Sequence, residues 1–192
     1  MSLLATVIEV GDFLDEAKIE FLIGGSLASS LWGQERTTHD ADIAALMIES
    51  QLDILERLIK WPYVMDSVDL RVSLASLEDF ASGQILNGET LDKVDLFLLK
   101  SDEYAFAQLS NRRYIELAPG KTLPFAAPED VVITKLRWFV LGNQTSDRQW
   151  NDIVQVLEMQ DGTLNDEYLK KWAKYFHITN LLLEAKSQIV SE

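Results

Sequence analysis

Two aspartates separated by one residue, Asp40 and Asp42, are the first candidates for chemistry in this chain. The segment 40–47 alternates acidic and apolar residues before it becomes fully apolar, which predicts a strand entering a core. Residues two apart in a strand point to the same face, so both carboxylates project together. Two like charges side by side are costly unless a cation or water screens them, and Mg²⁺ prefers oxygen ligands. The pair therefore predicts a Mg²⁺ and phosphate site, with a solvated strand end as the alternative.

A Gly24-Gly25-Ser26 turn precedes the acidic pair, between an apolar strand at 21–23 and a short helix at 27–32. The glycines let the backbone approach a ligand closely, the helix N-terminus offers N–H groups to an anion, and Ser26 adds a hydroxyl. By itself the sequence is also a common turn. The short segment between the turn and the acidic pair predicts that the two lie on adjacent strands.

A third carboxylate would complete a two-metal site and accept a proton from an attacking hydroxyl. Asp95 lies within residues 93–99, which are otherwise mostly apolar and predict a strand. An acid in such a strand is seldom there for packing, because an unpaired buried carboxylate is expensive. Asp69 has the same local pattern in the segment 68–74, which also predicts a strand. We favour Asp95 and keep Asp69 as the competing candidate.

The elements that must position these residues form a mixed α/β part followed by an all-helical part. Turn residues at 87–90 predict a hairpin between strands 84–87 and 93–99, and Pro119-Gly120 predicts another between 113–117 and 122–125. Pro128-Glu129-Asp130 begins a run of helices at 129–141, 146–160, 166–176 and 179–190, with the proline at a first helical position. We expect an α+β fold in which residues 1–127 form the core and residues 128–192 form a helical region packed on it.

Composition narrows the class of protein. The chain has 192 residues, a formal net charge of -14, no cysteine and two histidines, so disulfides and thiolate metal sites are excluded and a histidine-rich zinc cluster is disfavoured. The charge repels long DNA, although surface solubility alone would explain it. No apolar run approaches the roughly 20 residues that cross a bilayer. These features predict a soluble, cytoplasmic protein that does not contact a membrane.

Taken together, the residues resemble a known group of enzymes. Residues 21–43, with Gly25-Ser26 followed by Asp40-Ala41-Asp42, resemble the signature of the polymerase-β-like nucleotidyltransferase superfamily. More narrowly, the chain is similar to minimal nucleotidyltransferases related to the AbiEii toxins of toxin–antitoxin and abortive-infection systems. The narrower resemblance is carried by residues 93–97, Arg112-Arg113, residues 128–130 leading to Lys135-Leu136, and residues 146–153.

The resemblance implies a small mixed sheet that carries Asp40, Asp42 and Asp95 around two Mg²⁺ ions. Gly25 and Ser26 would then hold the phosphates of an NTP. The AbiEii-like relatives also imply a helical lysine and a later helical aspartate, for which Lys135 and Asp152 match best. A solvated helix face is the alternative for Lys135, and pairing with Arg148 one turn earlier is the alternative for Asp152. Arg36, just before the acidic pair, could reach a phosphate or base, or be a plain loop arginine.

The expected activity is transfer of a nucleoside monophosphate from an NTP to an acceptor hydroxyl. The acceptor could be an RNA end such as that of tRNA, a protein or a small molecule, and a toxin role would bring an antitoxin partner. The alternative is a non-catalytic module that binds a nucleotide or a partner protein, which the small size and acidity of the chain favour.

Overall fold

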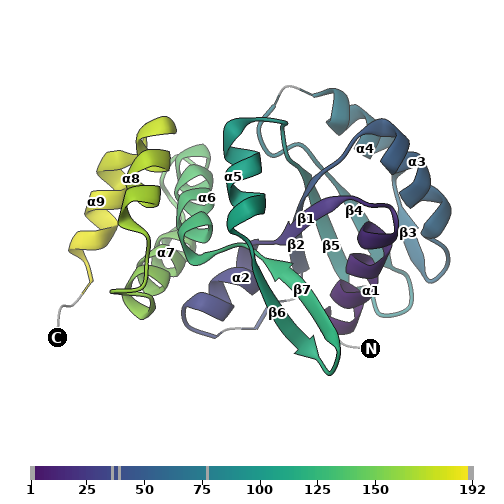
Figure 1. The fold of residues 1–192 in the computed structure, drawn as a ribbon, viewed down its shortest axis with the longest axis horizontal. Helices are drawn as coiled ribbons and strands as arrows, with labels where there is room; N and C mark the ends of the chain where they lie inside the picture. Colours follow the sequence, from purple (N-terminus) through teal and green to yellow (C-terminus); the bar gives the residue numbers. More distant parts are fainter. Residues whose placement is uncertain (1–2, 36, 39, 77, 190–192) are drawn as a thin grey trace. The chain divides into compact units, whose positions relative to one another are not determined.

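A computed structural model describes residues 3–35, 37–38, 40–76 and 78–189 of the chain (Figure 1). The contacts divide the chain into two compact units. The first unit is Met1–Ser26 with Thr38–Phe125, and the second is Leu27–Thr37 with Ala126–Glu192. Within the described part of the chain, no helix is long and apolar enough to cross a membrane.

The first unit contains the whole sheet. Among the described residues, its strands are β1 (Glu20–Ile23), β2 (Asp40–Leu46), β3 (Tyr63–Met65), β4 (Ser82–Asn87), β5 (Lys93–Leu98), β6 (Arg113–Ala118) and β7 (Lys121–Phe125). They pair in the order β3-β4-β5-β2-β1-β7-β6. β2 runs parallel to β5 and β1 runs parallel to β7, while the other neighbours are antiparallel. The predicted α+β class with a mixed sheet is confirmed, and both predicted hairpins are present.

Alternation along the central strands explains which face of the sheet is covered. On β2, Ala41 and Ile43 are fully buried, while Asp40, Asp42 and Ala44, which alternate with them, are half-buried. On β5, Val94 and Leu96 are fully buried in the same way. A period of two places all acidic residues of these strands on the opposite face. The apolar half of the pattern anchors the sheet, and this anchoring fixes where the carboxylates point.

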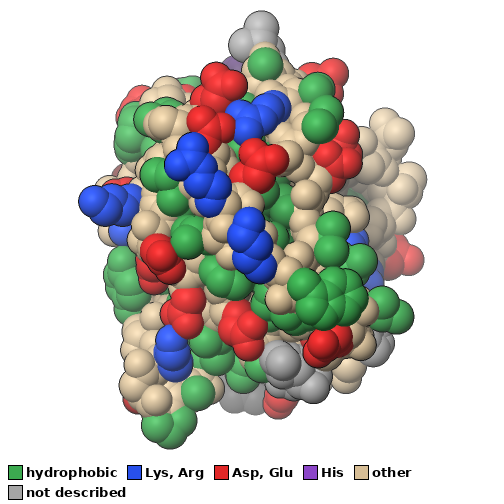
Figure 2. All heavy atoms as spheres, turned by 90° about the vertical axis from the view of Figure 1, so that its right-hand side faces the viewer, with side chains coloured by type: hydrophobic (Ala, Val, Ile, Leu, Met, Phe, Trp, Pro, Cys, Tyr) green, Lys and Arg blue, Asp and Glu red, His purple; other side chains and the backbone are tan. Residues whose placement is uncertain are grey.

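Four helices belong wholly to the first unit: α1 (Leu3–Glu16), α3 (Glu49–Leu58), α4 (Ser67–Ala75) and α5 (Glu103–Asn111). α1 contacts β1, β2 and β7, and a Cβ at Gly11 would lie 2.8 Å from Leu123, so the helix approaches the sheet closely there. Figure 2 shows the side of this unit that carries α3 and α4, where basic, acidic and apolar side chains are intermingled. On that side Arg71 bridges Asp53 and Glu56 at 2.8 Å each.

The prediction of a strand at 68–74 was wrong, because this segment is the helix α4. Its alternating apolar residues resemble a strand, but Asp66 caps a helix here by accepting hydrogen bonds from the backbone N–H groups of Val68 and Asp69. Leu70 then packs on β4, where a Cβ at Gly83 would lie 2.5 Å from it. A local cap and one buried contact thus override the period-two pattern. The short strand β3, which the sequence did not predict, precedes the helix.

The second unit is helical in its described part. It holds α6 (Pro128–Leu141), α7 (Asp147–Met159), α8 (Asp166–Tyr175) and α9 (Thr179–Ser187), which correspond to the four predicted helices. Helix α2 (Gly25–Trp32) starts in the first unit, and most of its length belongs to the second. The hydrogen bonds of Trp32 explain this: its Nε1 donates to the oxygen of Ala126 at 2.7 Å, and its own carbonyl accepts from Gln160 at 2.9 Å.

Candidate active site

Strand β2 presents Asp40 and Asp42 on the open face of the sheet. Both are half-buried, and the fully buried Ala41 between them points to the covered face. The hydroxyl of Thr38 donates to the Oδ1 of Asp40 at 3.1 Å and also to its carbonyl oxygen at 3.0 Å, which fixes the first carboxylate at the strand entry. The predicted same-face arrangement of the pair is therefore present.

The register between β2 and β5 brings the third acid to the pair. Asp95 lies directly opposite Asp42, and Lys93 lies directly opposite Asp40. Neighbouring strands are about 4.8 Å apart, so these four side chains occupy adjacent positions on one face. Asp69 lies instead on the exposed first turn of α4. Of the two candidates for the third carboxylate, the register places Asp95 beside the pair.

Lys93 is a member of this group that the sequence analysis did not single out. Its Nζ lies 2.8 Å from the Oδ2 of Asp95, and the two side chains are 35% and 16% exposed. The hydrogen bond to Asp95 is the largest cause that raises the pKa of Lys93, and the negative charges of Asp95, Asp40 and Asp42 add to it. The spacing of two residues in a strand was the signal that could have revealed this pair, because it puts both side chains on one face.

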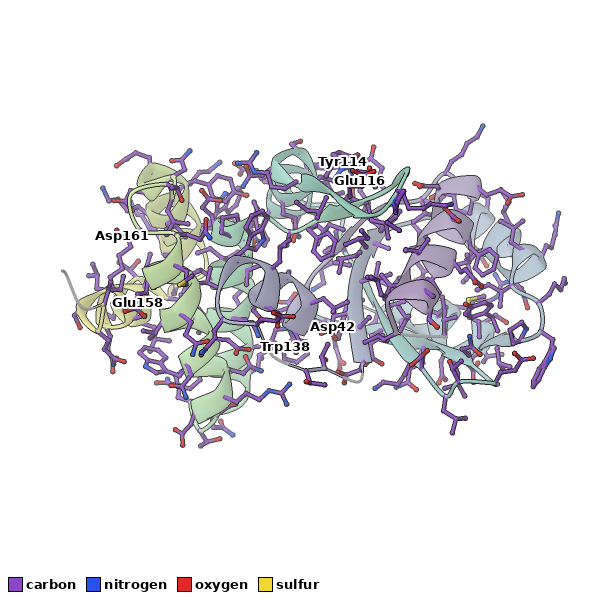
Figure 3. All side chains as sticks on the ribbon, turned by 90° about the horizontal axis from the view of Figure 1, so that it is seen from below. Asp42, Tyr114, Glu116, Trp138, Glu158 and Asp161 are labelled. Atoms are coloured by element: carbon purple, nitrogen blue, oxygen red, sulfur yellow. The ribbon has the colours of Figure 1, made fainter. Side chains whose placement is uncertain are left out.

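The Gly-Gly-Ser turn lies directly against Asp42, which is labelled in Figure 3. The backbone N–H of Gly24 donates to the carbonyl oxygen of Asp42 at 2.8 Å. Gly25 has a φ of +51°, and a Cβ at this position would lie 1.7 Å from the Oδ2 of Asp42. Glycine is thus required twice, by the left-handed backbone and by the carboxylate that occupies the space of a side chain. Ser26 follows in the first turn of α2.

The donor chemistry of this group fits a hard divalent cation. Asp40, Asp42 and Asp95 offer carboxylate oxygens, the ligands that Mg²⁺ takes, and the turn at Gly25 brings the N-terminus of α2 next to Asp42. Among the described residues, no group of three or more histidine, cysteine, aspartate or glutamate side chains is arranged so that it could hold a metal ion. The Oδ2 of Asp95 is engaged by Lys93 instead. The residues fit the metal in kind and in strand position.

The second unit contains the other two predicted residues, Lys135 on α6 and Asp152 on α7. The Nζ of Lys135 donates to the Oδ2 of Asp152 at 2.8 Å, and the residues are only 8% and 6% exposed. The hydroxyl of Ser29 lies 3.5 Å from the same Oδ2. Lys135 is therefore not on a solvated helix face, and its partner is Asp152, which the sequence alone did not predict. The two residues form a buried ion pair.

A polar pocket of about 360 Å³ adjoins this pair within the second unit. It is lined by Gln34, Glu35, Arg148, Asn151, Asp152 and Gln155. The side-chain amide of Gln155 donates to that of Gln34 at 2.9 Å, which joins the segment after α2 to helix α7. Asp152 thus faces Lys135 and also lines a pocket.

The remaining basic residues of interest are Arg36, His39 and Arg112. Arg36, predicted to contact the nucleotide, and His39 lie outside the described residues. Arg112 forms an ion pair with Glu20 at 3.3 Å and lies over the ring of Tyr114, 5.7 Å from its centroid. Figure 3 labels Tyr114 on β6. The contacts of Arg112 give it a structural role at the start of this strand.

Comparison with known proteins places the fold. No family model matches the chain, and no curated protein matches its sequence. Among solved structures, a nucleotidyltransferase-like antigenic protein from Paracoccidioides brasiliensis is 17% identical with a TM-score of 0.52, over 99% of this chain and 94% of that one. The antibiotic-resistance factor ANT(2'')-Ia is 12% identical with a TM-score of 0.55, over 96% of both chains. At these identities the similarity concerns the fold, which is that of nucleotidyltransferase-like proteins.

Proposed function

We propose that this protein is a nucleotidyltransferase that moves a nucleoside monophosphate from an NTP to an acceptor hydroxyl. One observation carries the proposal: the register sets Asp95 opposite Asp42, while the backbone of Gly25 lies against the carboxylate of Asp42. In this proposal, Asp42 belongs to the oxygen ligands of the metal and also contacts the turn that binds phosphate. The nucleotidyltransferase-like fold supports the same reading.

In the proposed site, Asp40 and Asp42 would hold two Mg²⁺ ions, and Asp95 would complete the set of carboxylates. When bound, the ions supply positive charge at the phosphate oxygens and ease deprotonation of a hydroxyl. The N–H groups at Gly25 and the hydroxyl of Ser26 hold the NTP phosphates. The covered, rigid faces of β2 and β5 keep these groups in place during the reaction.

The proposed chemistry is one in-line displacement. The acceptor oxygen forms a bond to the α-phosphorus, and the bond from that phosphorus to the bridging oxygen of the β-phosphate breaks. Pyrophosphate leaves with the electron pair, and the proton of the acceptor hydroxyl passes to Asp95. The family resemblance also gives Lys135 and Asp152 of the second unit proposed catalytic roles, and the ion pair between them holds the ammonium of Lys135 in place. Arg36 remains a proposed nucleotide contact.

The class of acceptor is inferred from the net charge of the chain and from one solved structure of similar fold. The net charge of -14 disfavours a large polyanion, so we place a protein or small-molecule hydroxyl ahead of a tRNA end. A structure of ANT(2'')-Ia holds adenylyl-2''-tobramycin, a nucleotidylated small molecule, with a TM-score of 0.55 to this chain at 12% identity. A toxin role with a cognate antitoxin stays a proposal from the AbiEii-like resemblance.

The direct test is incubation of the purified protein with each of the four α-³²P-labelled NTPs and Mg²⁺. Total tRNA, total protein extract and a panel of small polyhydroxylated molecules serve as acceptors in parallel. We expect label to appear in one acceptor class, or on the protein itself, only with Mg²⁺ present. No transfer, together with no NTP or Mg²⁺ binding by calorimetry, would refute the proposal.

A non-catalytic nucleotide- or partner-binding module is the second candidate, and the ion pair between Lys93 and Asp95 favours it because it occupies the third carboxylate. Expression in cells separates the two. Growth arrest that requires both Asp40 and Asp42 indicates a catalytic toxin. A phenotype that persists in Asp40→Ala and Asp42→Ala indicates a binding module.

A further inference from the structure

The open face of the sheet carries three acids and one base at four adjacent positions. Asp40 and Lys93 are opposite each other, and Asp42 and Asp95 are the next opposite pair. On the far side of β5, Lys93 faces Leu86 and Asp95 faces Gln84, both uncharged. Among these register neighbours, Lys93 is therefore the residue that balances the negative charge of the three carboxylates.

Lys93 makes its contact at the oxygen that a cation would need. The 2.8 Å ion pair joins its Nζ to the Oδ2 of Asp95, and the side chain of Asp95 is only 16% exposed. A carboxylate in this state is already neutralised and has one fewer lone-pair site for a metal ion. The side chain of Lys93 is 35% exposed and flexible, so its ammonium can move to water without disturbing the strand.

We propose that Lys93 is an internal competitor for the divalent cation: its ammonium holds Asp95 in the metal-free protein and must leave that carboxylate before it can bind metal or accept a proton. This inference rests on the proposed function and concerns how the same site is controlled. Lys93 acts through Asp95 and is a positioning residue. Its presence stabilises the empty carboxylate group and weakens the first binding of metal.

The alternative roles of Lys93 make different predictions. A lysine that binds substrate phosphate would strengthen NTP binding and leave binding of the bare metal unchanged. A lysine that only supports the strand would affect folding and leave the metal affinity of the folded protein unchanged. Competition alone predicts that removing the ammonium tightens binding of the metal by itself.

The test uses Mn²⁺ as the probe, without nucleotide, titrated into the full chain and followed by electron paramagnetic resonance of free Mn²⁺ and by calorimetry. We expect Lys93→Met to bind Mn²⁺ about tenfold more tightly than the unmodified protein, because removing one positive charge a few Å from a divalent ion is worth a factor of this order in a partly solvated site. Lys93→Arg keeps the charge and should stay within about twofold of the unmodified protein.

Lys100→Met is the matched control. It removes the same charge from a lysine just beyond β5 whose Nζ pairs with Asp79 at 2.7 Å, and it should leave the Mn²⁺ affinity unchanged. If Lys100→Met tightens binding as much as Lys93→Met, general charge explains the effect and the competition is refuted. Unchanged or weaker Mn²⁺ binding in Lys93→Met also overturns it.

A second readout covers folding and separates this inference from the proposed function. Without metal, Lys93→Met should have a lower Tm, because three carboxylates then repel one another, and saturating Mn²⁺ should raise its Tm by more than it raises that of the unmodified protein. Loss of Mn²⁺ binding in Asp42→Asn tests the metal site itself. A site that binds Mn²⁺ through Asp42 but is indifferent to Lys93 leaves the proposed function standing and removes the competitor.

Discussion

The two candidate groups of charged residues, one in each unit, differ in exposure and in the ratio of acids to bases. On the sheet of the first unit, three carboxylates share a half-open face with one lysine, so acids outnumber bases among these described register neighbours. In the second unit, Lys135 and Asp152 form a buried ion pair, with the hydroxyl of Ser29 at 3.5 Å from Asp152. A buried, balanced pair holds a shape by itself, whereas a half-open, unbalanced group has spare capacity for a cation from outside. On the proposed function, ligand capture belongs to the first group, and the second is a positioned ion pair.

The largest expected effect comes from removing one acid of the unbalanced group. Asp42→Asn should lower nucleotidyl transfer by about 10³-fold or more, because it removes a metal ligand and a charge at the reacting centre. The Tm should stay the same or rise, since one like charge is gone. Initial rates with a labelled NTP and a thermal melt measure both quantities. Asp95→Asn should lower the rate of nucleotidyl transfer in the same way.

Asp69→Asn is the control for that comparison, because Asp69 lies exposed on the first turn of α4. Its rate should match that of the unmodified protein. A large loss of rate in Asp69→Asn, with Asp95→Asn active, would contradict the assignment of the third carboxylate.

Removing one partner of the Lys135–Asp152 ion pair should reduce stability, whereas Asp42→Asn should leave it unchanged or raise it. Asp152→Ala leaves the ammonium of Lys135 buried without its partner, so the free energy of unfolding should fall by about 3–5 kcal/mol. Urea denaturation followed by circular dichroism measures the change. The double variant Lys135→Met with Asp152→Ala should recover part of the loss, because no charge is then stranded. If the single and double variants are equally destabilised, the pair does not act as a unit.

Gly25→Ala should reduce stability by less than Asp152→Ala does, but it should disturb the group of carboxylates around Asp42. The new methyl group would overlap the Oδ2 of Asp42 at 1.7 Å, and a φ of +51° costs a non-glycine residue about 1–2 kcal/mol. We expect Mn²⁺ binding to be lost along with part of the stability. Calorimetry and urea denaturation follow the two effects.

Two glycines serve as matched controls for that variant. Gly120→Ala has the same kind of backbone, with a φ of +73°, but open space around the Cβ, so it measures strain alone. Gly24→Ala also has open space and should be neutral for folding. If Gly120→Ala abolished metal binding as well, the effect of Gly25→Ala would not depend on contact with Asp42.

Much of the fold could be predicted from the sequence, because the signals concerned are local. Apolar periodicity and turn residues predicted both hairpins and the C-terminal helices, and the alternation at Asp40 and Asp42 predicted one shared face. The period-two pattern failed at residues 68–74, where Asp66 caps a helix instead. A cap two residues before a segment can outweigh the pattern inside it.

The parts of the site that escaped prediction depend on long-range pairing. Asp95 was favoured from its own strand and from the family resemblance, but no local feature of either strand specifies the order β4-β5-β2 that makes it a neighbour of Asp42. The same holds for the packing of Gly25 against Asp42 and for the partner of Lys135, which lies 17 residues later in the chain. Residues 27–37 join the helical unit through contacts of Trp32 that are equally distant in sequence.

The smallest effect concerns one tyrosine in each unit, the buried Tyr63 and the half-buried Tyr168, each hydrogen-bonded to an acid. The hydroxyl of Tyr63 donates to the Oε2 of Glu9, and that of Tyr168 donates to the Oδ1 of Asp130, both at 2.7 Å. Burial, followed by the contact with Glu9, raises the pKa of Tyr63 to about 12. Burial, followed by the charge of Asp130, raises the pKa of Tyr168 as well.

A raised tyrosine pKa means that folding favours the neutral phenol, so the stabilisation is complete below the unfolded value near 10 and is lost as the pH rises from about 10 to 12. Absorbance at 295 nm should show these two tyrosines ionising late or only on unfolding. Tyr63→Phe should cost about 1 kcal/mol at neutral pH, from the lost hydrogen bond, and should flatten the alkaline decline in stability. An unchanged decline in both Tyr63→Phe and Tyr168→Phe would mean that other groups control it. A flattened decline in Tyr168→Phe alone would place the alkaline sensitivity in the helical unit and not in the unit that contains the sheet.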